Sequence, residues 1–145
     1  MAFNLDNYET VEDRLKKFWS DNPNGRIATF ISNISEDGHM VVIGCEVYKN
    51  EEDARPVSTG YAQEYKGQGG FANKEAWLEN CETSAIGRAL ANWKYQGSDK
   101  SRPSKEEMSK SIGSSTEGKT AVKAPKETPK EGVVAASSAT PSPAK

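Results

Sequence analysis

Hydrophobic positions follow a helical period most cleanly in residues 73–95. At about 100° per residue, one side of this segment collects apolar residues: Trp77, Leu78, Cys81, Ala85, Ala89 and Trp93, with Ile86 and Leu90 at its edge. A second line holds small residues: Asn80, Ser84, Gly87 and Ala91. Arg88 stands between the two lines. The pattern predicts a long helix that buries its apolar side against a sheet and lets another backbone approach its small side.

A second amphipathic stripe predicts a helix at residues 4–20. Its apolar residues are Val11, Leu15, Phe18 and Trp19. Thr10 and Asp13 have the spacing of a capping box, which marks a helix start.

Three runs between these helices have the composition and alternation of strands. They cover residues 26–34, 39–48 and 57–65, and an Asp-Gly turn joins the first two. Gly60 and Ala62 share one face of the third run and leave room for the long helix. We therefore predict an α+β domain in the order α-β-β-β-α, an antiparallel meander packed on the long helix.

The composition changes near residue 97. Residues 101–145 contain no aromatic residue and are rich in Ser, Pro, Lys, Ala, Thr and Glu. Such a segment buries too little apolar surface to offset its ordering entropy. The sequence predicts a folded core at residues 1–97 and a disordered Ser/Pro/Lys-rich tail at residues 98–145.

Charge divides near the same boundary. Residues 1–100 hold 11 Lys and Arg against 16 Asp and Glu, a net of −5, and residues 101–145 hold 8 against 5, a net of +3. A nucleic-acid-binding domain usually has a basic footprint. Any such surface here must be a local basic stripe or one assembled between subunits.

Catalytic and metal-binding patterns are hard to find. His39 is the only histidine and falls in the predicted hairpin turn, and Cys45 and Cys81 occupy apolar positions that suit reduced, buried thiols. Residues 66–72 are glycine-rich but lack nucleotide-loop spacing, so a flexible connector is favoured over a phosphate site. Glu82, which projects into the apolar arc of the helix, is interpreted as a buried structural acceptor. We expect a protein that is not an enzyme and that uses no cofactor and no metal.

No apolar run of membrane-spanning length and no apolar signal region occurs, which favours a cytoplasmic protein without a membrane partner. In a virus the compartment would be the host cytoplasm.

Basic residues interleaved with aromatic residues suit single-stranded nucleic acid, because cations follow the phosphates while rings stack on bases. The candidate DNA-binding residues are Arg88, Arg55, Lys74, Lys94, Lys66, Tyr61 and Tyr65. Tyrosines in strands are also common packing residues, so this pattern alone leaves both interpretations open.

The long helix and the strand before it resemble a bacteriophage recombination family. The matching stretches are residues 55–64 (RPVSTGYAQE) and 79–91 (ENCETSAIGRALA), with Thr83, Ser84, Ala85, Arg88, Ala89 and Leu90 followed by Trp93-Lys94-Tyr95. The chain is similar here to the single-strand annealing proteins of the Erf (essential recombination function) type. The resemblance covers residues 5–97. The chain departs from distant relatives at Gly87, where a basic residue is usual.

The resemblance implies a β-β-β-α core, assembly into homo-oligomeric rings or filaments, and binding of single-stranded DNA in a basic groove. It also implies strand annealing, in recombination or replication, without nucleotide hydrolysis. Sequence-independent annealing requires phosphate contacts that leave base edges free. Arg88, Lys94, Arg55, Lys74 and Lys66 would make those contacts.

Two alternatives remain open. One is a replication-type protein that coats single-stranded DNA without annealing it. The other is an oligomeric protein-interaction module, which the acidic core favours, with a tail that tethers a replication or recombination partner.

Overall fold

The elements follow the predicted order. A computed structural model describes residues 4–68, 74–96 and 102–114. A short 3-10 helix η1 (Leu5–Asn7) precedes helix α1 (Val11–Asp21), and three strands follow: β1 (Arg26–Ile34), β2 (Met40–Tyr48) and β3 (Ser58–Tyr65). Helix α2 (Trp77–Trp93) and helix α3 (Lys105–Ser114) complete the described chain. The predicted α-β-β-β-α order is confirmed.

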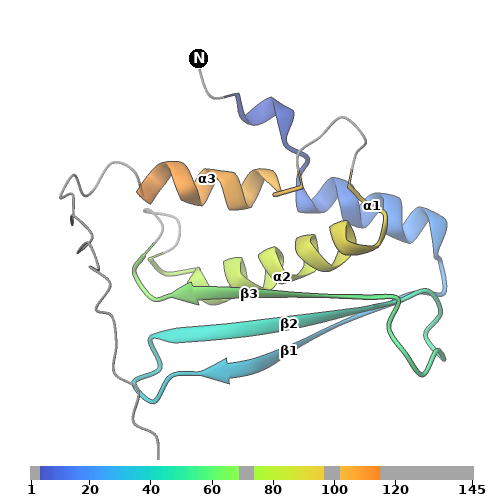
Figure 1. Ribbon diagram of the computed structural model, residues 1–145, viewed down its shortest axis with the longest axis horizontal. Helices are drawn as coiled ribbons and strands as arrows, with labels where there is room; N and C mark the ends of the chain where they lie inside the picture. Colours follow the sequence, from blue (N-terminus) through green and yellow to red (C-terminus); the bar gives the residue numbers. More distant parts are fainter. Residues whose placement is uncertain (1–3, 69–73, 97–101, 115–145) are drawn as a thin grey trace, which may run out of the picture.

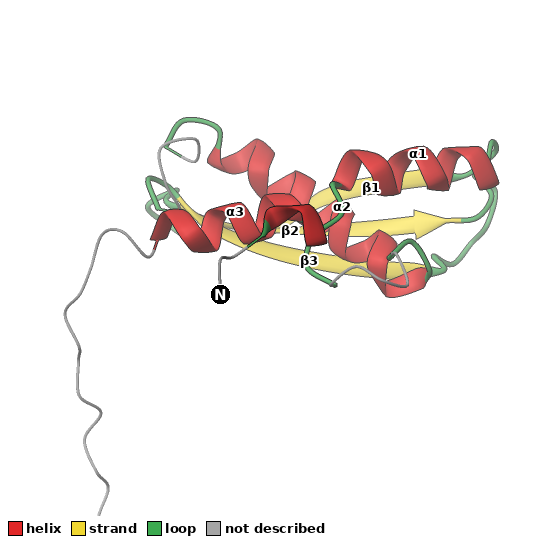
Figure 2. Cartoon of the chain, turned by 90° about the horizontal axis from the view of Figure 1, so that it is seen from above, coloured by secondary structure: helices red, strands yellow, loops and turns green. Residues whose placement is uncertain are grey.

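The three strands form one antiparallel sheet in the order β1-β2-β3. Gly38, at a φ of 69°, completes the turn between β1 and β2. Opposite Gly44 of β2 lie Phe30 of β1 and Tyr61 of β3, and a bulge interrupts the β1 register between Ile31 and Asn33. All described helices lie on the same side of the sheet, and no described element covers its other face, called the open face below (Figures 1 and 2).

Helix α2 closes the helix side of the sheet, as its apolar stripe predicts. Alternate residues of β2, Val41, Ile43, Cys45 and Val47, are buried with Cys81, Ala85, Ala89 and Leu90 of α2 in one core cluster. Gly60 permits the close approach of β3 to α2, because a Cβ atom added there would lie 2.3 Å from the backbone nitrogen of Ala89. The predicted role of Gly60 is confirmed.

Helix α1 begins later than predicted. The expected helix at residues 4–20 is divided into η1 and α1, which are separated by extended backbone at Tyr8 and Thr10. Thr10 is the N-cap of α1: its Oγ1 accepts a hydrogen bond from the Asp13 N–H at 3.0 Å and donates one to Asp13 Oδ2 at 2.7 Å. The second bond lowers the pKa of Asp13. The capping-box spacing therefore marks the true start of the helix.

Helix α3 corrects the prediction of a tail that is disordered from residue 98. The side chain of Ser104 accepts a hydrogen bond from the Glu107 N–H, and the Glu107 carboxylate accepts one from the Ser104 N–H at 2.9 Å. This reciprocal pair is a capping box and favours a helix at this point. The remaining tail, residues 115–145, lies outside the described residues.

A buried arginine ties α3 to the other helices. Arg14 of α1 has an exposed fraction of 0%. Its guanidinium donates hydrogen bonds at 2.9 Å to the carbonyl oxygens of Gly87 and Arg102. Because backbone carbonyls of α2 and of the segment before α3 share one cation, the three helices are held as one unit.

Candidate nucleic-acid interface

Aromatic side chains gather on the open face of the sheet. Tyr61 and Tyr65 are four residues apart on β3 and so share this face. Phe30 joins them from β1, because it and Tyr61 both pair with Gly44. The Phe30 and Tyr61 rings meet edge to face, with centroids 6.2 Å apart and planes at 86°. Two predicted site residues are thus brought together, and a third aromatic residue is added.

Gly44 lets the two rings lie against the sheet. A Cβ atom at this position would lie 2.5 Å from Phe30 Cζ and 2.8 Å from Tyr61 Cε1. The rings therefore cover the strand and still expose much of their surface: 39% of Phe30, 51% of Tyr61 and 46% of Tyr65. Gln63 donates a hydrogen bond at 2.7 Å to the Tyr65 hydroxyl, which orients this ring.

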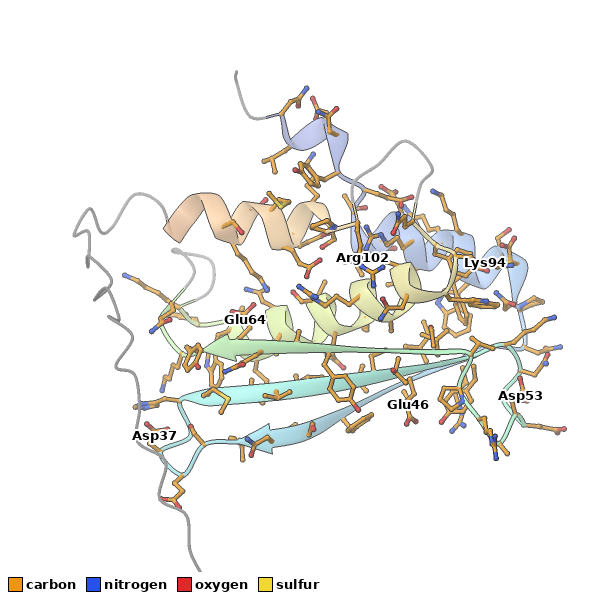
Figure 3. All side chains as sticks on the ribbon, viewed as in Figure 1. Asp37, Glu46, Asp53, Glu64, Lys94 and Arg102 are labelled. Atoms are coloured by element: carbon orange, nitrogen blue, oxygen red, sulfur yellow. The ribbon has the colours of Figure 1, made fainter. Side chains whose placement is uncertain are left out.

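A cation, Arg26, and a carboxylate, Glu46, lie around Tyr48 at one end of the open face. The Arg26 guanidinium lies 3.9 Å from the centroid of the Tyr48 ring, which is buried beneath it. The Tyr48 hydroxyl donates a 2.6 Å hydrogen bond to Glu46, and this bond raises the pKa of Tyr48. Figure 3 shows Glu46 on the side of the sheet away from the helices. Arg26 is therefore positioned to contact phosphate beside the aromatic surface.

The structure places four of the five predicted cations at two opposite ends of the molecule. The Lys66 N–H donates to the His39 carbonyl at the β1–β2 turn, and Lys74 lies just before α2, whose start is at the same end. Arg55 lies in the β2–β3 loop, and Lys94 follows α2 at its other end. In Figure 3 Asp37 and Glu64 mark the first end, and Asp53 and Lys94 mark the second. A nine-residue strand separates the ends by roughly 25 Å.

The fifth cation, Arg88, is paired within the chain. Its Nε lies 2.6 Å from Oε1 of Glu107 on α3. The row of small residues on α2 also faces other helices of the same chain. Gly87 faces Val11 of α1, and Ser84 accepts a 2.8 Å hydrogen bond from Lys110 of α3. The small residues therefore let helices of the same chain approach.

Three lysines surround a hollow where α1 and α2 end. Lys16 and Lys17 come from α1 and Lys94 follows α2, and the hollow has a volume of about 480 Å³. Lys94 Nζ lies 4.8 Å from the Trp93 ring centroid, so the ring holds the cation near the surface. Of these three lysines, the sequence predicted only Lys94 as a DNA-binding residue, because about 77 residues of chain separate it from Lys16 and Lys17.

Other chemistry is sparse in the part of the chain that the structure describes. No group of three or more His, Cys, Asp or Glu side chains there could hold a metal ion. Both cysteines are buried, and burial raises the pKa of Cys45 to about 12. Glu82 is exposed rather than buried as expected, and it accepts a 2.6 Å hydrogen bond from the Thr29 hydroxyl of β1. Among the described helices, none has the length and apolar character needed to cross a membrane.

Comparison with known families gives one match. Residues 15–93, more than half of the chain, match the family described as Slr1353 N-terminal dsRNA-binding domain-like. The matched segment extends from within α1 to the last residue of α2, so it includes the whole sheet and excludes α3. No curated protein and no solved structure matches the chain.

Proposed function

The chain belongs to the Slr1353 N-terminal dsRNA-binding domain-like family, and we propose that it binds nucleic acid through the open face of its sheet. The observation that carries this proposal is the exposed aromatic surface of Phe30, Tyr61 and Tyr65. The family description supports nucleic acid as the class of ligand. The aromatic surface adds the means of contact, because flat rings bind bases by stacking.

A single-stranded nucleic acid is the ligand that this surface fits best, and the resemblance to Erf-type proteins favours DNA. In a duplex the bases stack on one another, and a ring on a flat sheet cannot reach their faces. In a single strand the faces are free, and each stacked base contributes about 1–3 kcal/mol. Arg26 and Lys66 lie beside the two ends of the aromatic row and would contact the phosphates.

Double-stranded RNA is a second candidate ligand, which the family description favours. Proteins bind such a duplex mainly through phosphate and 2′-hydroxyl contacts, and lysines rather than exposed rings make those contacts. The hollow formed by Lys16, Lys17 and Lys94 would then be the relevant surface. The two candidates therefore predict different sensitive residues.

Annealing of complementary strands, in phage recombination or replication, remains our proposal for the biological role. It rests on the resemblance of residues 79–91 to Erf-type proteins. Stacking on the aromatic surface would hold a strand without covering its hydrogen-bonding edges, as annealing requires. A coating protein would bind equally well but would not accelerate pairing, so the rate at which two complementary oligonucleotides pair distinguishes these roles.

The test measures fluorescence anisotropy of labelled oligonucleotides of equal length: single-stranded DNA, single-stranded RNA and both duplexes. We expect tight, sequence-tolerant and salt-sensitive binding of single-stranded DNA. Tyr61→Ala should weaken it by about 1–3 kcal/mol, roughly 5- to 150-fold. Trp19→Ala is the matched control, because Trp19 is an exposed ring on α1, on the helix side of the sheet.

Absence of single-stranded DNA binding at low salt would contradict the leading proposal. Preference for duplex RNA, insensitive to Tyr61→Ala and weakened by Lys16→Ala, would favour the second candidate instead.

A further inference from the structure

Strand β1 has an unpaired edge with an apolar surface. It is an outer strand of the sheet, and among the described residues β2 is its one paired neighbour. Residues 27–34 contain no charged side chain. Ile31 and Ile34 expose 56% and 54% of their surface, and both are larger fractions than for Phe30 on the same strand. A strand with unpaired N–H and C=O groups beside exposed apolar side chains is prone to pair with a strand of another chain.

A hollow adjoins this edge on the helix side of the sheet. Its volume is about 280 Å³, and its lining includes the apolar side chains of Ile31, Ile43 and Leu78 and the acidic residues Glu79 and Glu82. Leu78 of α2 is itself exposed. An apolar side chain entering from outside β1 would therefore find apolar partners.

The other outer strand is protected. Glu64 of β3 forms an ion pair with Lys110 of α3, and Lys66 follows the strand directly. Charged groups at an edge oppose pairing with another chain. The two edges of the sheet thus differ, and only β1 has the character of an interface.

We propose that β1 pairs antiparallel with β1 of a second copy of this chain, about a two-fold axis near Thr29. Two features favour a second copy over an unrelated strand. Pairing centred on Thr29 places Ala28 opposite Phe30 on the open face, so a small side chain meets a large one. It also places Ile27 opposite Ile31 on the helix side, beside the hollow.

The axis is perpendicular to the sheet, so both copies keep their helices on the same side. The product is a six-stranded sheet with one continuous open face that carries two sets of Phe30, Tyr61 and Tyr65. A two-fold contact of this kind closes on itself and produces a dimer, not a ring or filament.

The interface also has a defined electrostatic signature. Glu82 accepts a hydrogen bond from Thr29, so two Glu82 carboxylates approach one another near the axis. Salt screens this repulsion. Dimerisation should therefore strengthen as salt is raised, whereas nucleic-acid binding should weaken. Because the salt dependences of dimerisation and of nucleic-acid binding have opposite signs, an experiment can distinguish failure of this inference from failure of the proposed function.

The first experiment is light scattering of the full chain without nucleic acid. The wild type should have twice the 15.8 kDa mass of one chain. Ile31→Glu should halve that mass with an unchanged circular dichroism spectrum, because the side chain is exposed in the monomer. Val57→Glu, an exposed apolar position outside β1, should leave the dimer intact. A monomeric wild type, or any assembly that survives Ile31→Glu, would overturn the proposal.

A second experiment tests the axis. Thr29→Cys should form an intermolecular disulfide under mild oxidation, since paired residues of adjacent antiparallel strands have Cα atoms about 4.5–5.5 Å apart. Both native cysteines are buried and should not compete. Thr59→Cys on β3 is the control. Equal crosslinking of the two variants would reject pairing through β1.

Discussion

Arg88 on α2 forms an ion pair with Glu107 on α3, with Nε and Oε1 2.6 Å apart. The Arg88 side chain is half exposed, whereas that of Glu107 is largely covered. Arg88, which the sequence predicts to contact the DNA backbone, is therefore engaged by a segment predicted to be disordered. Its availability to phosphate depends on whether α3 stays docked.

This pairing predicts the behaviour of two variants. Arg88→Ala should weaken single-stranded DNA binding less than Tyr61→Ala does, because the Arg88 charge is already partly neutralised. Glu107→Gln should strengthen binding at low salt by about 1 kcal/mol or less, the usual scale for a solvent-screened pair. Anisotropy titrations of the two single variants and the double variant measure both effects. A loss on Arg88→Ala larger than that on Tyr61→Ala would show that Arg88 is free to bind DNA.

The contact between β3 and α2 gives a stability prediction. At Gly60 an added Cβ would meet backbone atoms of Ala85 and Ala89, which cannot turn aside. Gly60→Ala should therefore destabilise the fold by about 1–3 kcal/mol, the cost of overpacking. Gly87→Ala is the matched control, because its Cβ meets only the side chain of Val11. There Cγ2 of the buried Val11 would lie 2.7 Å from the new Cβ, so Val11 must shift, and the better helix propensity of alanine, about 1 kcal/mol, offsets only part of that cost. Urea unfolding of both variants should separate them, and equal midpoints would contradict the argument.

The fold could be predicted because its signals are local. Alternation along β2, the Asp-Gly turn and the helical stripe of α2 each lie within one segment, and all three correspond to the observed elements. Helix α3 was missed although Ser104 and Glu107 have capping-box spacing. The helix has few apolar residues, so its sequence does not indicate that it packs against the rest of the domain. Polar contacts between residues distant in sequence hold it there, such as that of Lys110 with Ser84.

The candidate site was harder to predict, since it depends on register and on distant segments. Tyr61 and Tyr65 follow from alternation within β3. Phe30 enters the surface only because β1 and β2 pair it with Gly44, and no local pattern specifies that register. Arg14 was missed for a related reason: a charged residue on an amphipathic helix is usually solvated, whereas here other helices bury it.

The buried thiols predict how stability changes with pH. Burial raises the pKa of Cys45 from 9.0 to about 12, and that of Cys81 is also raised. The unfolded chain therefore loses these protons first as the pH rises. For Cys45 this stabilising contribution is complete below about pH 9 and declines between about pH 9 and pH 12, by up to about 1.4 kcal/mol per pH unit, and Cys81 contributes in the same direction.

Urea unfolding at neutral and at alkaline pH tests this dependence, with Cys45→Ala as the comparison. The variant should be less stable at neutral pH and should lose less stability on going to alkaline pH. If wild type and variant have the same pH slope, another group dominates it; the Tyr95 hydroxyl, whose pKa burial also raises, is the next to test.

Arg14 and Lys17 provide the last prediction, because both cations lie beside the Glu9 carboxylate but in different surroundings. Arg14 is fully buried, with Nε 3.6 Å from Glu9 Oε2, whereas about half of the Lys17 side chain is exposed. Removing Arg14 leaves the buried Gly87 carbonyl and the partly buried Arg102 carbonyl without this donor. Arg14→Ala should therefore cost about 3–5 kcal/mol, the range for breaking a buried charged contact. Lys17→Ala should cost under about 1 kcal/mol, because water replaces an exposed ammonium. Urea unfolding gives both values, and proteolysis near residue 102 should accelerate in Arg14→Ala alone, since α3 loses its tie to α1. Equal costs for the two variants would mean that the charge of Glu9, rather than the carbonyl contacts of Arg14, holds these helices together.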